Sequence, residues 1–114
     1  MSAPQLAQEM AASLRSSKNE LSSVNQQLAH LQRQEKLAQV TTKELESYPT
    51  EKVWRSCGKT FILQDKRRYL DDLSHDEGVL KEQRKNLEIK QNYLNTSVEK
   101  TMDNLRELMK KSQT

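Results

Sequence analysis

The side chains that most often carry catalytic or metal chemistry are scarce in this sequence of 114 residues. It holds one cysteine, Cys57, and two histidines, His30 and His75. A zinc site needs about four such ligands, usually in closely spaced pairs. We therefore interpret Cys57 as a reduced thiol in a turn and both histidines as surface residues. Since the sequence also contains no glycine-rich phosphate loop, we expect no enzyme activity, no metal and no cofactor.

Two features could bind nucleic acid. The basic run Lys66-Arg67-Arg68 could contact phosphates, but two aspartates follow it closely, which favours a helix surface that faces solvent or a partner. Trp54 could stack on a base, yet no repeat of basic and aromatic residues surrounds it. The net charge of +3 comes from 19 basic and 16 acidic residues that are interspersed, as on the outside of coiled coils. We expect no nucleic acid among the partners.

The composition predicts long helices rather than a compact globule. Hydrophobic residues make up 33% of the chain and charged residues 31%, which fits either disorder or solvated helices that bury a narrow stripe. The presence of only two Gly and two Pro favours the helices. No stretch approaches the roughly 20 apolar residues of a membrane helix, and the N-terminus shows no secretory signal. Together with the single cysteine, these features lead us to expect a cytoplasmic protein without a membrane partner.

Heptad patterns predict two long coiled-coil helices, at residues 3–39 and 65–111. The apolar positions of the first helix form two sets: Ala7, Leu14, Leu21 and Leu28, and Ala3, Met10, Val24, Leu31 and Ala38. Those of the second helix, with one Thr among them, are Leu73, Leu80, Leu87, Leu94, Thr101 and Leu108, and Leu70, Val98 and Leu105. Polar residues interrupt both seams and help to fix register and partner choice: Ser17, Glu35, Glu77, Arg84 and Gln91.

Shorter signals place the breaks between elements. Thr41 and Glu44 have the spacing of a capping box, and Pro49 stops the turn that follows, which predicts a separate short helix at residues 41–48. Asp65 is expected to cap the second long helix. Within that helix, Gly78 allows a kink near residues 74–78.

Residues 51–64 do not follow a helical pattern and predict a β-hairpin. Residues 53–55 and 59–63 are rich in β-branched and aromatic side chains, and residues 56–58 supply a turn. A lone hairpin is marginally stable in water and leaves both edges open. Adjacent apolar residues put apolar side chains on both of its faces, which a monomer would expose. The alternative is a small self-contained core, but we expect assembly with strands of other chains through Val53, Trp54, Phe61, Ile62 and Leu63.

The two long helices flank the hairpin, so the second is expected to fold back antiparallel on the first. Both chain ends then lie at one tip, and the hairpin lies at the other end. If the numbers of paired positions add up to about 115, the pairs are Leu28 with Leu87, Leu21 with Leu94, Met10 with Leu105 and Ala7 with Leu108. The predicted fold is dominated by α-helix: residues 1–114 form one domain, a long antiparallel coiled coil with one central β-hairpin.

This order of helix, hairpin and helix resembles the β-type subunits of prefoldin. Residues 58–64, Gly-Lys-Thr-Phe-Ile-Leu-Gln, are similar to the second hairpin strand of such a subunit. Residues 93–98, Tyr-Leu-Asn-Thr-Ser-Val, and residues 103–109, Asp-Asn-Leu-Arg-Glu-Leu-Met, are similar to its C-terminal helix. The motifs cover residues 41–109, and the remaining residues match by heptad layout.

The resemblance implies a heterohexamer of two α-type and four β-type subunits. In such an assembly the hairpins join into β-barrels that form a body, and the coiled coils extend from it as tentacles. The resemblance also implies an ATP-independent co-chaperone that captures unfolded actin and tubulin and transfers them to the cytosolic group II chaperonin.

Given this resemblance, the free ends of the two helices are candidates for binding unfolded protein. Methionine suits such a surface because its side chain is flexible and polarizable. The alternative is that these positions are ordinary seam residues. The apolar candidates at the tip are Leu6, Met10, Leu14, Met102, Leu105, Leu108 and Met109.

The sequence leaves two main hypotheses from different classes. The first is a chaperone subunit that binds unfolded protein through its tips. The alternative is a structural coiled-coil adaptor that binds one specific partner helix through the same seam. A third hypothesis, nucleic-acid binding through residues 66–68, would require a strongly salt-dependent association.

Overall fold

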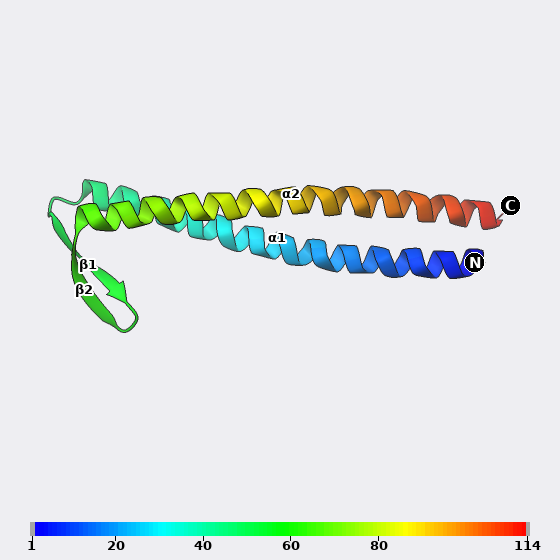
Figure 1. Cartoon of the computed structure of the whole chain (residues 1–114), viewed down its shortest axis with the longest axis horizontal. Helices are drawn as coiled ribbons and strands as arrows, with labels where there is room; N and C mark the ends of the chain where they lie inside the picture. The colour runs from blue at the N-terminus through cyan, green and yellow to red at the C-terminus, as the bar shows by residue number, and fades with distance from the viewer. Residues whose placement is uncertain (1, 114) are drawn as a thin grey trace. The chain divides into compact units, whose positions relative to one another are not determined.

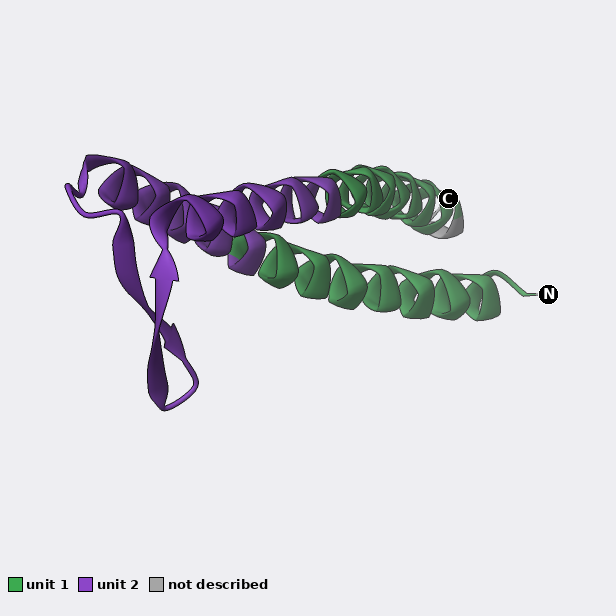
Figure 2. Ribbon diagram, turned by 60° about the vertical axis from the view of Figure 1, so that its left-hand side comes forward, with its two compact units in different colours: residues 1–29, 85–114 green, residues 30–84 purple. Residues whose placement is uncertain are grey.

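The computed structural model describes residues 2–113, with the side chains of residues 2–111. The chain forms helix α1 (Ala3–Ser47), strands β1 (Lys52–Cys57) and β2 (Thr60–Asp65), and helix α2 (Lys66–Gln113) (Figure 1). It divides into unit 1, residues 1–29 and 85–114, and unit 2, residues 30–84 (Figure 2). Two long helices with a central antiparallel hairpin confirm the predicted fold class.

In unit 1 the first part of α1 and the last part of α2 run antiparallel, and the helix ends lie at the same end of the unit (Figure 2). The core of this unit consists of Val24, Leu28 and Leu94, with Leu21 and Leu87 packed against them. All five are predicted seam residues, and two predicted pairs, 28 with 87 and 21 with 94, share this cluster. The heptad pattern therefore predicted the packed face of both helices.

A polar contact between the helices lies beside this cluster. Gln91 Nε2 donates a hydrogen bond to Asn25 Oδ1 at 2.7 Å. The predicted register would put position 90 opposite position 25, so the observed contact is one position away. This contact lies close to the predicted pairing, in which the numbers add up to about 115.

The helices of unit 2 carry a charged pair in their seam. Glu35 is buried, and both its carboxylate oxygens accept hydrogen bonds from Arg84 Nε, at 3.2 and 2.9 Å. Both residues stand at seam positions that the sequence marked as polar interruptions. Ala38, one turn further along α1, is buried as predicted.

Helix α1 continues without a break to Ser47, so the prediction of a separate helix at residues 41–48 was wrong. Thr41 and Thr42 donate their hydroxyl hydrogen bonds to the carbonyl oxygens of Leu37 and Ala38, both at 2.8 Å. These hydroxyls are thus satisfied inside the helix and do not cap a new one. The helix ends just before Pro49, as expected, because the residue that precedes a proline is disfavoured in helical conformation.

The turn of the hairpin begins two residues later than predicted, at Gly58 instead of Ser56, and ends one residue later. Cys57 pairs with Thr60, so Gly58 and Lys59 form a two-residue loop, and residues 56 and 57 belong to β1. Gly58 has a φ of 64°, and no non-glycine residue in the described part of the chain has a positive φ. A positive φ at the first loop position only is the pattern of a type II′ turn, which matches the right-handed twist of paired strands.

Helix α2 begins directly after Asp65 and is unbroken through Gly78 to Gln113. The kink allowed near residues 74–78 therefore does not interrupt the helix. At the other end of the chain, Ser2 and Gln5 form a capping box: each backbone N–H bonds the other side chain, at 3.2 and 3.4 Å. Neither described helix is both long enough and apolar enough to cross a membrane.

Candidate assembly and client-binding surfaces

The hairpin presents an exposed apolar surface on one of its faces. Side chains alternate along a strand, so Trp54 and Ser56 of β1 lie on the same face as their partners Leu63 and Phe61 of β2. Trp54 and Phe61 are each 68% exposed, and Leu63 is also exposed. We call Trp54, Phe61 and Leu63 the outer apolar face.

The opposite, inner face of the hairpin is turned toward the helices of unit 2. Val53 is buried there, although Ile62 on the same face stays exposed. A hollow of about 500 Å³ lies at the base of the hairpin, and its lining includes Leu45, Tyr48 and Tyr69 as well as Val53 and its neighbour Trp54. The five predicted assembly residues are therefore split: three form the outer apolar face, one is buried and one is exposed on the inner face.

The hairpin also leaves backbone groups available at its edges. In the described part of the chain the sheet has two strands, β1 and β2, and these pair with each other. Each strand consequently has one edge whose N–H and C=O groups lack a partner strand. Open edges of this kind are templates for strand addition from another chain.

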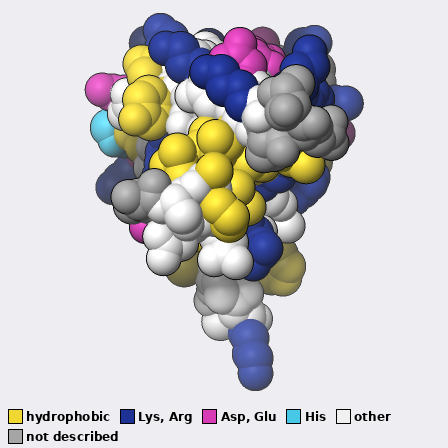
Figure 3. Space-filling view, turned by 90° about the vertical axis from the view of Figure 1, so that its right-hand side faces the viewer, with side chains coloured by type: hydrophobic (Ala, Val, Ile, Leu, Met, Phe, Trp, Pro, Cys, Tyr) yellow, Lys and Arg dark blue, Asp and Glu magenta, His cyan; other side chains and the backbone are white. Residues whose placement is uncertain are grey.

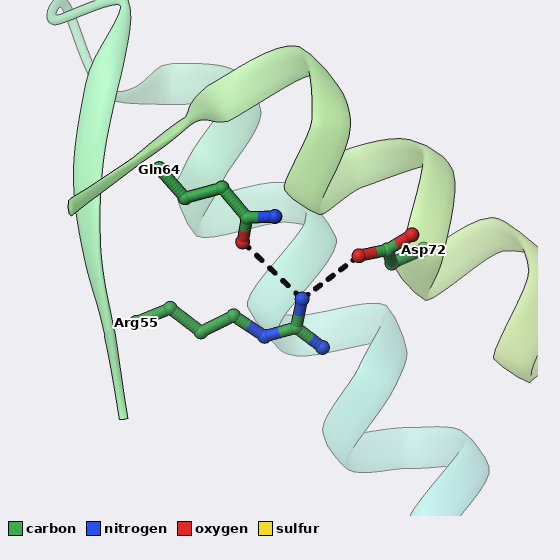
Figure 4. Close-up of polar contacts among 3 residues, drawn as sticks. All are labelled: Arg55, Gln64 and Asp72. Atoms are coloured by element: carbon green, nitrogen blue, oxygen red, sulfur yellow. Dashed lines mark hydrogen bonds and ion pairs between the residues drawn. The ribbon is translucent and has the colours of Figure 1, made fainter. Parts of the chain in front are cut away.

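Arg55 ties the inner face of the hairpin to α2 (Figure 4). Its Nη1 donates hydrogen bonds to Gln64 Oε1 at 3.2 Å and to Asp72 Oδ2 at 2.8 Å. Its guanidinium carbon lies 4.5 Å from the centroid of the Tyr69 ring, a distance at which cation–π attraction acts. These contacts were not predicted from the sequence, because nothing in the local pattern of Arg55 distinguishes it from other basic residues on a strand.

The predicted tip residues lie at the end of unit 1 and are less buried than its core. Leu6 and Met109 are exposed, Met109 by 54%, whereas Val24 in the core is 2% exposed. In an end-on view, hydrophobic side chains gather between Lys and Arg side chains (Figure 3). The other five predicted tip residues are half-buried along the seam: Met10, Leu14, Met102, Leu105 and Leu108.

The cysteine and the two histidines lie apart from one another. Cys57 is exposed at the end of β1, and His30 and His75 are exposed on different helices. Among the described residues, no group of three or more His, Cys, Asp or Glu is placed to hold a metal ion. In the basic run, Lys66 Nζ donates a hydrogen bond to the carbonyl oxygen of Tyr48 at 2.9 Å. This lysine therefore helps to hold the base of the hairpin.

Comparison with known proteins agrees with this architecture. The family model described as prefoldin subunit matches residues 8–112. The chain is 70% identical over 106 residues to prefoldin subunit 1 of Saccharomyces cerevisiae. The aligned region covers 93% of this chain and 97% of that protein. It is 34% identical over 84 residues to prefoldin subunit 1 of Mus musculus, and that alignment covers 73% of this chain and 69% of that protein.

A solved structure shows the same fold at lower sequence identity. The prefoldin beta subunit from Thermococcus strain KS-1 matches with a TM-score of 0.84 and 22% identity, over 93% of this chain and 94% of that chain. The matches include both helices and the hairpin, and they confirm the resemblance found at residues 58–64 and 93–109. The chain belongs to the prefoldin subunit family, whose members are components of a hetero-oligomeric co-chaperone.

Proposed function

We propose that this chain is a β-type subunit of a prefoldin heterohexamer, with two α-type and three further β-type subunits as partners. The observation that carries the proposal is the hairpin, which has an exposed apolar face and two open edges. Strands added at these edges would satisfy the free backbone groups and cover Trp54, Phe61 and Leu63. Val53 and Ile62 complete the proposed assembly set, and residues 1–114 act as one domain that joins an inter-subunit β-barrel.

The function of the assembly is ATP-independent capture of unfolded proteins in the cytoplasm. Actin and tubulin are the proposed clients, and the cytosolic group II chaperonin receives them. The decrease in burial toward the end of unit 1 supports client contact at the tip, since half-covered apolar side chains can switch from seam to client at low cost. The proposed client-contact residues are Leu6, Met10, Leu14, Met102, Leu105, Leu108 and Met109.

Native mass spectrometry of the chain, purified from its own cells through a small C-terminal tag, tests the assembly. The expected result is a complex of six subunits of similar size, two of them α-type. A monomer, or a complex with one unrelated stoichiometric partner, would contradict the proposal and leave the coiled-coil adaptor in its place.

Capture of chemically denatured actin by the assembled complex tests the tip. The variant Leu6→Ser/Met109→Ser removes two exposed tip side chains, and we expect it to capture less actin than the wild type. The matched control is Ile89→Ser/Tyr93→Ser, which removes two apolar side chains that are at least as exposed but lie elsewhere on α2. Equal losses in both variants would show that capture does not depend on the tip.

A further inference from the structure

The side chain of Arg55 connects β1, β2 and α2 of unit 2. It stands on the inner face of β1 and hydrogen-bonds Gln64 on β2 and Asp72 on α2 (Figure 4). It also lies over the ring of Tyr69 in the first turn of α2. We call these four residues the Arg55 latch. Their atoms come from segments separated by up to 17 positions in the chain, so the latch exists only when hairpin and helix hold a fixed angle.

The base of the hairpin is held by contacts of its own, and these contacts do not include its outer part. The backbone N–H of Lys66 bonds the carbonyl oxygen of Glu51 at 2.7 Å, and Lys66 Nζ bonds that of Tyr48. Both contacts lie where β2 runs directly into α2. Arg55 lies further along β1, and its ion pair with Asp72 is a side-chain contact from this outer part back to a helix.

We infer that the Arg55 latch positions the hairpin for assembly before a partner subunit arrives. Neighbouring side chains on a strand point to opposite faces, so holding Arg55 against α2 keeps Trp54, which is 68% exposed, on the opposite face of the hairpin. A hairpin already held in this orientation loses less conformational freedom when strands of another subunit add to it. The inference rests on the proposed function, because it names what prepares the same assembly surface.

The chemistry of Arg55 suits a positioning role better than that of a lysine. The guanidinium donates to Gln64 and Asp72 through Nη1 while it stacks near the Tyr69 ring, and a substitution by lysine does not preserve such a stacked planar arrangement. The ion pair is partly exposed, with side-chain exposures of 34% for Arg55 and 46% for Asp72. Its loss should therefore free the hairpin without unfolding the helices.

The native cysteine allows a direct test of the orientation. Cys57 is the sole cysteine and is exposed at the outer end of β1, and the exposed His75 of α2 can be replaced by a second one, His75→Cys. Spin labels at both positions report the distance distribution between hairpin and helix in the full chain. We expect Asp72→Asn to broaden this distribution and Asp71→Asn, an equal charge change at the adjacent exposed position, to leave it narrow. An unchanged distribution in Asp72→Asn would overturn the inference.

Assembly kinetics with the other subunits form the second arm. We expect Asp72→Asn and Arg55→Lys to join the complex about fivefold more slowly than the wild type, the size expected for loss of one partly exposed ion pair. Tyr69→Phe keeps the ring under Arg55 and should assemble at the wild-type rate. Wild-type assembly rates for both latch variants, despite a broadened distribution, would overturn the positioning role.

The two arms separate failure of the inference from failure of the proposed function. If the wild-type chain joins no prefoldin complex, the proposed function is wrong, and the label distances still decide whether the latch fixes the hairpin. If the wild type assembles and the latch variants match it in both measurements, only the inference fails.

Discussion

Glu35 and Arg84 occupy seam positions where coiled coils usually hold apolar side chains. Their side chains are only 11% and 27% exposed, and Arg84 Nε contacts both oxygens of Glu35. A charge left without its partner in such a place is costly, while replacing both charges by apolar groups is often neutral or stabilising. We therefore infer that the pair selects the alignment of the two helices and adds little to stability. If one helix slid along the other, one of the two charges would be buried against an apolar residue.

Arg84→Leu should lower the free energy of unfolding by about 1–3 kcal/mol, because Glu35 then stays buried without this cation. Glu35→Leu/Arg84→Leu should recover most of the loss. Urea unfolding followed by far-ultraviolet circular dichroism measures both. As a control, Lys90→Leu breaks a pair with Glu20 whose side chains are both 51% exposed, and should cost less than about 1 kcal/mol. A double variant as unstable as the single one would contradict this explanation.

Gly58→Ala should destabilise the hairpin by about 1–2 kcal/mol, since the turn holds this residue at a φ of 64°, where a Cβ clashes with its own backbone. Nothing else lies within 4 Å of an added Cβ, so the effect comes from the backbone alone. Fluorescence of Trp54, the sole tryptophan, reports the change during urea unfolding. Lys59→Ala, at the other loop position, is the control and should leave the signal unchanged.

At the scale of elements, the features that depend on local periodicity could be predicted from the sequence. The features that depend on contacts between distant residues could not. The seam positions of α1 and α2 repeat every seven residues, so they were predictable. The separate helix at residues 41–48 was wrong because a threonine hydroxyl can either cap a helix or bond back inside it, and the sequence pattern is the same for both. The Arg55 latch was missed because its four residues meet only after the hairpin has folded onto α2.

Gly78 offers a test of α2 at this scale. The helix is regular there, and an added Cβ would meet nothing within 4 Å, so Gly78→Ala should raise the free energy of unfolding by up to about 1 kcal/mol. Urea unfolding measures this, with Ser74→Ala, one turn earlier on an exposed position, as the control for helix propensity. A lower stability of Gly78→Ala would show that the position takes part in a bend or contact that the regular helix lacks.

At the scale of the whole molecule, the hairpin exposes aromatic side chains that a stable monomeric protein would usually bury. Trp54 and Phe61 are more exposed than Val53, the buried apolar residue of the same hairpin. In the proposed assembly, coverage by other subunits would remove this apolar surface from water, and each aromatic ring would contribute a large area. The subunit is therefore expected to be most stable within its complex.

Trp54→Ser/Phe61→Ser should abolish or strongly reduce incorporation into the complex while the helix content of the free chain stays unchanged. Native mass spectrometry of the mixed subunits measures incorporation, and circular dichroism measures helix content. Tyr93→Ser removes an aromatic ring of similar exposure from the outside of α2 and should assemble normally. Normal incorporation of the double variant would place the assembly contact outside the outer apolar face.

Because the helices of unit 1 pair antiparallel, the apolar stripe of α1 stays uncovered during part of translation. The first part of α1 finds its seam partner only in residues 85–113, which are synthesised after it. At roughly 5–20 residues per second, the stretch that follows α1 takes several seconds to synthesise. During that time a helix with an uncovered apolar stripe is exposed to the cell. While it is being synthesised, this member of a co-chaperone family therefore exposes apolar side chains as an unfolded client protein does. We expect the amount of correctly folded subunit to depend on the abundance of other chaperones during translation.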